Sequence, residues 1–272
     1  MEAGILIGAG LGLGIGFVMA LTGAGGGVLA VPLLGFVFGL PVQDAAPVAL
    51  VAVCVAAGIG SAMGLHSHHV RYRAAGWIAA TAMLGAPLGL WLGRNVEDRP
   101  LVIAFALLLA VQAARTLLHS RSDDGRAKNA PAKAPPCAID PSTHRLRWTR
   151  GCTAVLGATG ILAGFLSTLL GIGGGFVVVP TLMRMSDLDM ESVTATSLAV
   201  VALIAAGSVA VMIAAGAPLA WQLALPFAFG TALGLVVGRS VSPYVPRRRL
   251  VQLFAVCCLV VAALLLGKSR ES

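Results

Sequence analysis

A glycine-rich phrase of twelve residues occurs twice in this chain and limits what the chain can fold into. Residues 23–34 read GAGGGVLAVPLL, and residues 171–182 read GIGGGFVVVPTL, 148 positions later. No charged residue occurs from Ala3 to Gln43 or from Ser192 to Gly238. One straight helix over the first of these stretches would be about 60 Å long, twice the roughly 30 Å hydrocarbon core of a bilayer. The three consecutive glycines therefore predict an interrupted membrane helix in each stretch.

Composition places the whole chain in a membrane. Of its 272 residues, 58% are hydrophobic and 11% are charged, which predicts an all-α polytopic membrane protein embedded in a lipid bilayer. The net charge of +8 comes from basic residues in short loops and one linker, without interleaved aromatic residues, so we expect no nucleic-acid partner. The sequence has no hydrolase or metalloprotease motif, so we expect no enzyme activity.

The repeat divides the chain into two homologous halves. We predict a first transmembrane repeat at 1–119, a basic disordered cytoplasmic linker at 120–150 and a second transmembrane repeat at 151–272. Each half has about four helices and opens with the glycine-broken helix. The later glycines repeat as well: Gly85, Gly89 and Gly93 match Gly230, Gly234 and Gly238, and Arg94 matches Arg239.

Two ways of threading the broken helices remain open. If the two short helices at each break form a re-entrant hairpin, each half has three full spans and the halves are inverted. If the broken segment crosses the membrane once, the halves are parallel. The positive-inside rule favours inversion, because the linker, the loop at Arg71 and Arg73, and Arg247 to Arg249 then share the cytoplasmic side.

Each break predicts an anion site. A helix that begins inside the membrane, at Val28 or Phe176, presents backbone N–H groups without intrahelical partners and about half a positive charge. Glycines let the oxygens of an anion approach this backbone. The spans contain no deep Lys or Arg, so backbone donors and hydroxyls would have to bind the anion. The expected substrate-binding residues are Gly25, Gly26, Gly27, Val28, Gly173, Gly174, Gly175 and Phe176, together with Thr22, Ser167, Thr196 and Ser197; Pro32 and Pro180 would fix the starts of the short helices.

The same residues allow other interpretations. The glycines could serve only close helix packing, and each hydroxyl could bond only its own backbone. A dinucleotide fingerprint would need glycine at Val28 or Phe176, so we expect no cofactor. His66, His68 and His69 lie in a loop near arginines without a nearby carboxylate, so we expect no metal site. The five cysteines lack C-x-x-C spacing and are interpreted as small apolar residues.

With its two Gly-Gly-Gly-x-x-x-x-Pro phrases and Thr196-Ser197-Leu198, the sequence resembles the TauE/SafE family of sulfite exporters over nearly the whole chain outside the linker. The resemblance implies a multi-pass carrier of sulfite, a sulfonate or a related organic anion in the bacterial inner membrane. The first half has Val48-Ala49 where the second has Thr196-Ser197, so hydroxyls would contribute from one side. An anion-selective channel and a non-transporting membrane scaffold or accessory subunit remain alternatives, and the oligomeric state is open.

Overall fold

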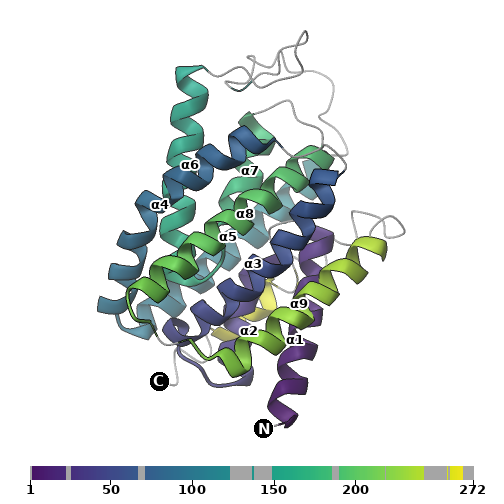
Figure 1. Ribbon diagram of the computed structural model, residues 1–272, viewed down its shortest axis with the longest axis vertical. Helices are drawn as coiled ribbons and strands as arrows, with labels where there is room; N and C mark the ends of the chain where they lie inside the picture. Colours follow the sequence, from purple (N-terminus) through teal and green to yellow (C-terminus); the bar gives the residue numbers. More distant parts are fainter. Residues whose placement is uncertain are drawn as a thin grey trace.

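The computed structural model describes residues 2–22, 26–66, 71–122, 137, 149–185, 190–217, 219–241, 256 and 258–265. The secondary-structure elements within these ranges are helices (Figure 1). They are α1 (Glu2–Thr22), the 3-10 helix η1 (Gly26–Leu29), α2 (Ala30–Val37), α3 (Val42–His66), α4 (Tyr72–Asn95), α5 (Asp98–Ser122), α6 (Arg150–Leu170), α7 (Gly175–Met185), α8 (Met190–Ala214) and α9 (Trp221–Val241). Residues 256 and 258–265 are also helical.

Six of these helices, namely α1, α3, α4, α6, α8 and α9, are long and apolar enough to cross a membrane. Large apolar side chains on their outer faces are exposed, among them Leu84 and Leu88 on α4 and Phe229 on α9. A surface of this kind needs lipid to cover it. The chain is therefore an all-α, multi-pass membrane protein, as its composition predicts.

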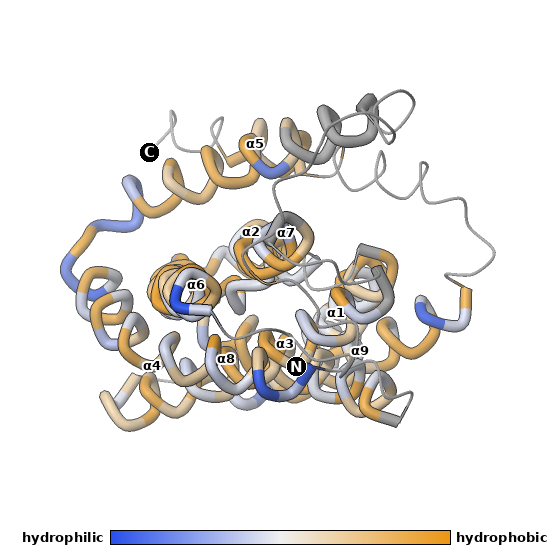
Figure 2. The backbone as a smooth tube through the Cα atoms, turned by 90° about the horizontal axis from the view of Figure 1, so that it is seen from above, coloured by the Kyte–Doolittle hydropathy of each residue, from blue (hydrophilic) through white to orange (hydrophobic). Residues whose placement is uncertain are grey.

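The helices form layers that mix the two halves. Seen from above, α4, α8, α3 and α9 lie in one row, α6, α2, α7 and α1 in a second, and α5 beyond them (Figure 2). The most extensive contacts join α1 to α9, α4 to α6 and α3 to α8, and each of these pairs takes one helix from each half. The two short helices α2 and α7 overlap in Figure 2 and lie one above the other in Figure 1.

Corresponding helices of the two halves run in opposite directions. In Figure 1, α1 rises from the bottom and α6 descends from the top. The central helices α3 and α8 are antiparallel, because Cys54 contacts Ala202 while Gly60, further along α3, contacts Leu198, earlier in α8. We call the end where α4, α6 and α8 begin the linker side, and the end where α1, α3 and α9 begin the N-terminal side. This is the arrangement that the hairpin alternative predicts.

Glycines allow the cross-half pairs to approach closely. A Cβ on Gly16 of α1 would overlap the backbone of Thr231 in α9, and one on Gly164 of α6 would overlap the backbone of Ala82 in α4. Gly16 and Gly164 are 148 residues apart, like the glycine phrases. The same contact is therefore made twice, once in each pair.

The later glycines differ from their predicted match by one helical turn. Gly234 would meet Leu13, and Gly85 would meet Ile161, which is the counterpart of Leu13 148 residues on. Gly234 thus takes the place of Gly85, whereas the sequence suggested Gly230. Because these glycines recur every four residues, the sequences of α4 and α9 can be aligned equally well after a shift of one helical turn. The residues that the glycines contact decide which alignment is structurally correct.

Two cysteines correct the interpretation of all five as small apolar residues. Cys137 of the linker and Cys152 in the first turn of α6 form a disulfide, with their Cα atoms 5.1 Å apart. Both are buried in the cluster that includes Ala74 of α4 and Val193 of α8. Cys54 and Cys258 are not disulfide-bonded, and Cys257 lies outside the described residues.

Candidate functional site

The second glycine phrase breaks the chain by a left-handed backbone. Gly171, Gly173 and Gly174 have φ values of 71°, 73° and 73°, a region that costs other residues steric strain. Gly171 ends α6, and its N–H donates to the carbonyl of Ser167 at 2.8 Å. The sequence prediction of a break here is confirmed, and α7 begins at Gly175, one residue before the predicted start at Phe176.

The start of α7 carries unused backbone donors. The first backbone N–H groups with a hydrogen bond at this end are those of Val177 and Val178. Both donate to the carbonyl of Gly174, at 3.1 and 3.3 Å. Among the described residues, the N–H groups of Gly173 to Phe176 have no hydrogen-bond partner. α7 has 11 residues, so its dipole adds positive potential at this end.

The first glycine phrase also interrupts a helix, but its backbone conformation differs from that of the second. Gly26 and Gly27 belong to η1, which leads into α2 at Ala30. A Cβ on Gly26 would lie 2.5 Å from the backbone nitrogen of Met19, so the segment folds tightly back on α1. Val28 is fully buried, and Gly25 lies outside the described residues.

The two phrases meet at one valine of α3. A Cβ on Gly27 would lie 3.0 Å from Cγ2 of Val53, and one on Gly173 would lie 2.9 Å from Cγ1 of the same side chain. Gly173 also approaches Val201 of α8, the counterpart of Val53 148 residues on, at 3.3 Å. Val53 and Val201 are 1% and 0% exposed. The breaks therefore converge on a closed apolar contact at the centre of the molecule.

The predicted hydroxyls fall into different environments. Ser197 is fully buried on α8, and its Oγ has no hydrogen-bond partner in the described part of the chain. Because Ser197 lies one turn before Val201, it shares the face of α8 that meets Gly173. Ser167, also fully buried, accepts a hydrogen bond from Ser208 at 3.0 Å. Thr196 accepts the N–H of Arg71 at 3.1 Å, and the side chain of Thr22 is not described.

The two prolines do not occupy equivalent positions in their helices. Pro32 is the third residue of α2, where an N–H would lack an intrahelical partner anyway. Pro180 lies in the second turn of α7, so the prediction that it fixes the helix start is wrong. Lacking an N–H, Pro180 leaves the carbonyl of Phe176 without its usual donor from the following turn.

Val53, Val201 and Ser208 belong to this region but were absent from the predicted site. A valine in an apolar span gives no sign of whether it faces lipid or the protein interior. The signal that was available is the identity of Val53 and Val201 at equivalent places in the two halves. Among the described residues no group of three His, Cys, Asp or Glu could hold a metal ion, and the His66 side chain, His68 and His69 lie outside them.

A separate cavity of about 310 Å³ touches the first broken helix from the N-terminal side. It reaches Val31 and Pro32 of α2 and Phe105 of α5, with Asp98 and Arg99 also in its wall. Burial, and then the nearby carboxylate of Asp44, raise the pKa of Asp98, while a hydrogen bond from the Val42 backbone lowers it. The cavity therefore places the titratable carboxyl group of Asp98 beside α2.

Comparison with known proteins adds a family assignment to this geometry. The sequence profile of the family described as sulfite exporter TauE/SafE matches residues 8–265. A probable membrane transporter protein of Xylella fastidiosa, strain Temecula1, is 30% identical over 183 residues, and one of strain 9a5c is 33% identical over 181 residues. Each match covers 66% of this chain and 62% of the relative.

A third relative extends this similarity to an archaeon. A probable membrane transporter protein of Methanocaldococcus jannaschii is 29% identical over 96 residues, which cover 31% of this chain and 36% of the relative. No solved structure matches the chain.

Proposed function

The chain belongs to the sulfite exporter TauE/SafE family, and from this premise we propose that it carries a small sulfur oxyanion, sulfite or a sulfonate, across the bacterial inner membrane. The anion would bind where the two broken helices converge. The observation that supports this most directly is the buried, unpartnered hydroxyl of Ser197 on the helix face that meets the second break.

The chemistry of this place suits an anion. The N–H groups of Gly173 to Phe176 supply donors without partners, and the Ser197 hydroxyl can donate one more hydrogen bond. Buried donors without partners are costly, so a ligand that accepts from them gains affinity. An oxyanion offers several acceptor oxygens to this set, whereas the valines around it offer a cation nothing.

The inverted halves give the carrier two access routes. The chain returns along α2 to the N-terminal side and along α7 to the linker side, while Val53 lies against both breaks and Val201 against the second. Exposing the site to one side would require one hairpin to move away from these valines. Switching between two such states is alternating access, the transport mechanism of carriers that are built from inverted repeats. We place the basic linker side in the cytoplasm.

Thermal stability of the purified protein tests binding. Sulfite, sulfoacetate, taurine, sulfate and chloride would be compared at matched ionic strength, with Ser197→Ala and, as a control, Ser240→Ala, whose exposed hydroxyl bonds only Val236. A ligand at a hundred times its dissociation constant adds about 2.7 kcal/mol. We expect a selective shift with a sulfur oxyanion and about fivefold weaker binding in Ser197→Ala. A flat response to all anions, or equal responses of the two variants, contradicts this site.

Counterflow in proteoliposomes tests the carrier mechanism itself. Unlabelled sulfite inside should accelerate entry of labelled sulfite, and the flux should saturate. Flux without counterflow would indicate an anion-selective channel of the same architecture. Absence of flux, together with a stably co-purifying protein, would indicate the scaffold alternative.

A further inference from the structure

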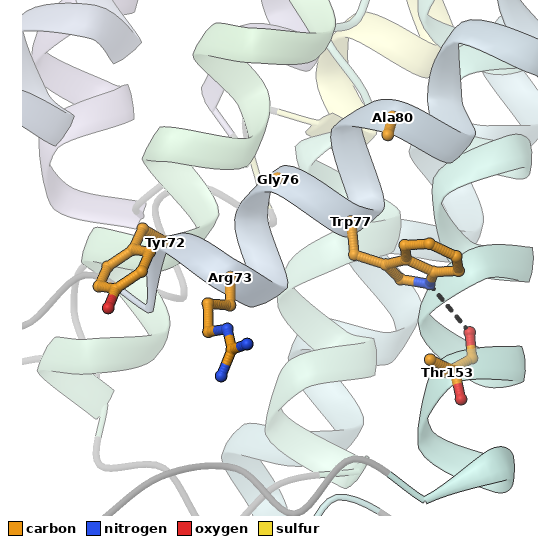
Figure 3. Close-up of a pocket in the computed structure, with 6 residues that line it drawn as sticks. All are labelled: Tyr72, Arg73, Gly76, Trp77, Ala80 and Thr153. Atoms are coloured by element: carbon orange, nitrogen blue, oxygen red, sulfur yellow. Dashed lines mark hydrogen bonds between the residues drawn. The ribbon is translucent and has the colours of Figure 1, made fainter.

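A notch of about 470 Å³ opens on the outer surface of the molecule at the linker side, between α4 and α6 (Figure 3). It is lined by Tyr72, Arg73, Gly76, Trp77, Ala80 and Thr153. The residues that alternate with them on α4, Ala74, Ala75, Ile78 and Ala79, are buried against the bundle. The notch therefore faces away from the protein, toward the surrounding lipid.

The lining combines an apolar floor with a polar rim. Gly76 and Ala80 leave room along the helix, while Trp77 forms a wall that is fixed by a hydrogen bond from its Nε1 to the carbonyl of Thr153 at 3.1 Å. Figure 3 shows Arg73 projecting between Tyr72 and Trp77. Tyr72 is 69% exposed and Trp77 41%. Within the described chain, Arg73 has neither an ion pair nor a hydrogen bond.

The position of the notch is that of a membrane interface. Tyr72 is the first residue of α4, which spans the membrane, and Trp91 is exposed near its other end. The rise from Tyr72 to Trp91 is about 28 Å, close to the thickness of the hydrocarbon core. Exposed aromatic residues at such spacing mark the two interfaces. The guanidinium of Arg73 therefore lies at headgroup depth, with Gly76 and Ala80 deeper.

The equivalent face of the other half lacks the small residues that make room for this notch. In the register set by the glycine contacts, Gly76 and Ala80 correspond to Leu225 and Phe229 of α9, which are 60% and 65% exposed. Arg73 corresponds to Gln222, and Trp77 to Pro226. The equivalent face therefore carries bulky side chains and no cation. The notch is a property of these residues and does not follow from the shared fold.

We propose that this notch binds one anionic phospholipid of the linker-side leaflet, with the lipid phosphate on Arg73 and an acyl chain along Gly76 and Ala80. Arg pairs with phosphate oxygens in a fork geometry, and basic pockets between membrane helices bind anionic headgroups. The rigid indole of Trp77 confines the glycerol region. The equivalent face on α9, which lies toward the opposite leaflet, binds no such lipid.

Lipid titration of the delipidated full-length protein tests this site. Native mass spectrometry would count bound phosphatidylglycerol and phosphatidylcholine of the same acyl chains, in wild type, Arg73→Gln, Gly76→Leu and the matched control Gln222→Ala. We expect the first phosphatidylglycerol to bind several-fold more tightly than phosphatidylcholine. Arg73→Gln should reduce that preference about fivefold, and Gly76→Leu should weaken both lipids, because it fills the notch and keeps the charge.

Several outcomes would overturn the proposal. They are equal affinity of wild type for the two lipids, an unchanged preference in Arg73→Gln, or an equal loss in Gln222→Ala. Glycerol 3-phosphate, added in place of lipid, should not bind; tight binding of this soluble phosphate would show an anion site rather than a lipid site. Thermal midpoints without added lipid should agree among the variants, so that a misfolded variant is recognised.

Discussion

Arg239 in the last turn of α9 donates from its Nη1 to the carbonyl oxygen of Gly60 in α3, at 2.9 Å. The contact joins the two halves near the linker side. Arg94, in the last turn of α4, makes a similar contact between the halves on the N-terminal side, where its Nη2 donates to the carbonyl of Ala215, just after α8, at 2.8 Å. Each arginine thus holds the central helix of the other half.

Replacing each arginine should show that the more buried contact contributes more to the stability of the fold. Arg239 is partly buried whereas Arg94 is exposed, so we expect Arg239→Ala to destabilise the fold by about 1–2 kcal/mol and Arg94→Ala by less. Thermal unfolding in detergent measures both, and Arg239→Lys controls for charge. A larger loss in Arg94→Ala than in Arg239→Ala would contradict this ranking.

Gly164→Ala should disrupt the pairing of α6 with α4. The added Cβ would overlap the backbone of Ala82, which has no flexible end to move aside, and overpacking of this kind costs about 1–3 kcal/mol. Gly14→Ala is the matched control, because a Cβ there meets nothing within 4 Å, and it should be neutral or slightly stabilising. Comparable thermal midpoints for the two variants would show that the close approach is unimportant.

The elements of this fold could be predicted from sequence because lipid leaves few choices. A glycine triplet in an uncharged stretch has to end one helix and begin another, and α7 begins within one residue of the predicted Phe176. The start of α2 was harder to predict, because η1 carries the chain from Gly26 to Leu29 before regular helix begins at Ala30. The residues of η1 are as apolar as those of an α-helical turn, so composition does not distinguish the two conformations here.

The candidate site shows where sequence reasoning stops. Ser197 and Thr196 are adjacent in sequence, so their roles depend on how α8 is rotated about its axis, which the sequence does not give. In the structure the Ser197 hydroxyl has no hydrogen-bond partner, whereas the Thr196 hydroxyl accepts the backbone N–H of Arg71. The pairing of Cys137 with Cys152 had no spacing signal, because the bond depends on tertiary packing that brings Cys137 beside the first turn of α6. The rotation of α8 and the position of Cys137 are set by tertiary packing, which cannot be predicted from the composition of the chain.

Val53→Ala and Val201→Ala should loosen the contact between the breaks. Each change removes two buried methyl groups and should cost about 2 kcal/mol of stability. If the site lies here, each variant should also transport larger sulfonates faster relative to sulfite than wild type does. Proteoliposome flux of sulfite and sulfoacetate measures this ratio, with Val111→Ala, an exposed position on α5, as the control. An unchanged ratio in both central variants would remove the valines from the transport path.

The disulfide between Cys137 and Cys152 should be visible by thiol counting. Denatured, unreduced protein should accept three maleimide labels, on Cys54, Cys257 and Cys258, and reduced protein should accept five. Cys137→Ser should expose Cys152 and give four labels without reductant, and it should cost about 3 kcal/mol for a loop of this length. Five labels on unreduced wild type would contradict the bond. Because we place the linker side in the cytoplasm, where thiols are kept reduced, protein from acid-quenched cells should accept five labels. Three labels there would place the linker on the opposite side of the membrane.

Stability near the N-terminal side should depend on pH through Asp98. Its pKa is raised by burial and then by Asp44, so the folded protein favours the protonated carboxyl. The resulting stability is fully present below the ordinary value of 3.8 and is lost as pH rises through the elevated value. Asp98→Asn should therefore be more stable than wild type at neutral pH, with a difference that shrinks toward pH ~4. Thermal midpoints across this range measure it, with Glu97→Gln as the charge-matched control; a difference that grows on acidification would show that Asp98 is stabilised in its charged form.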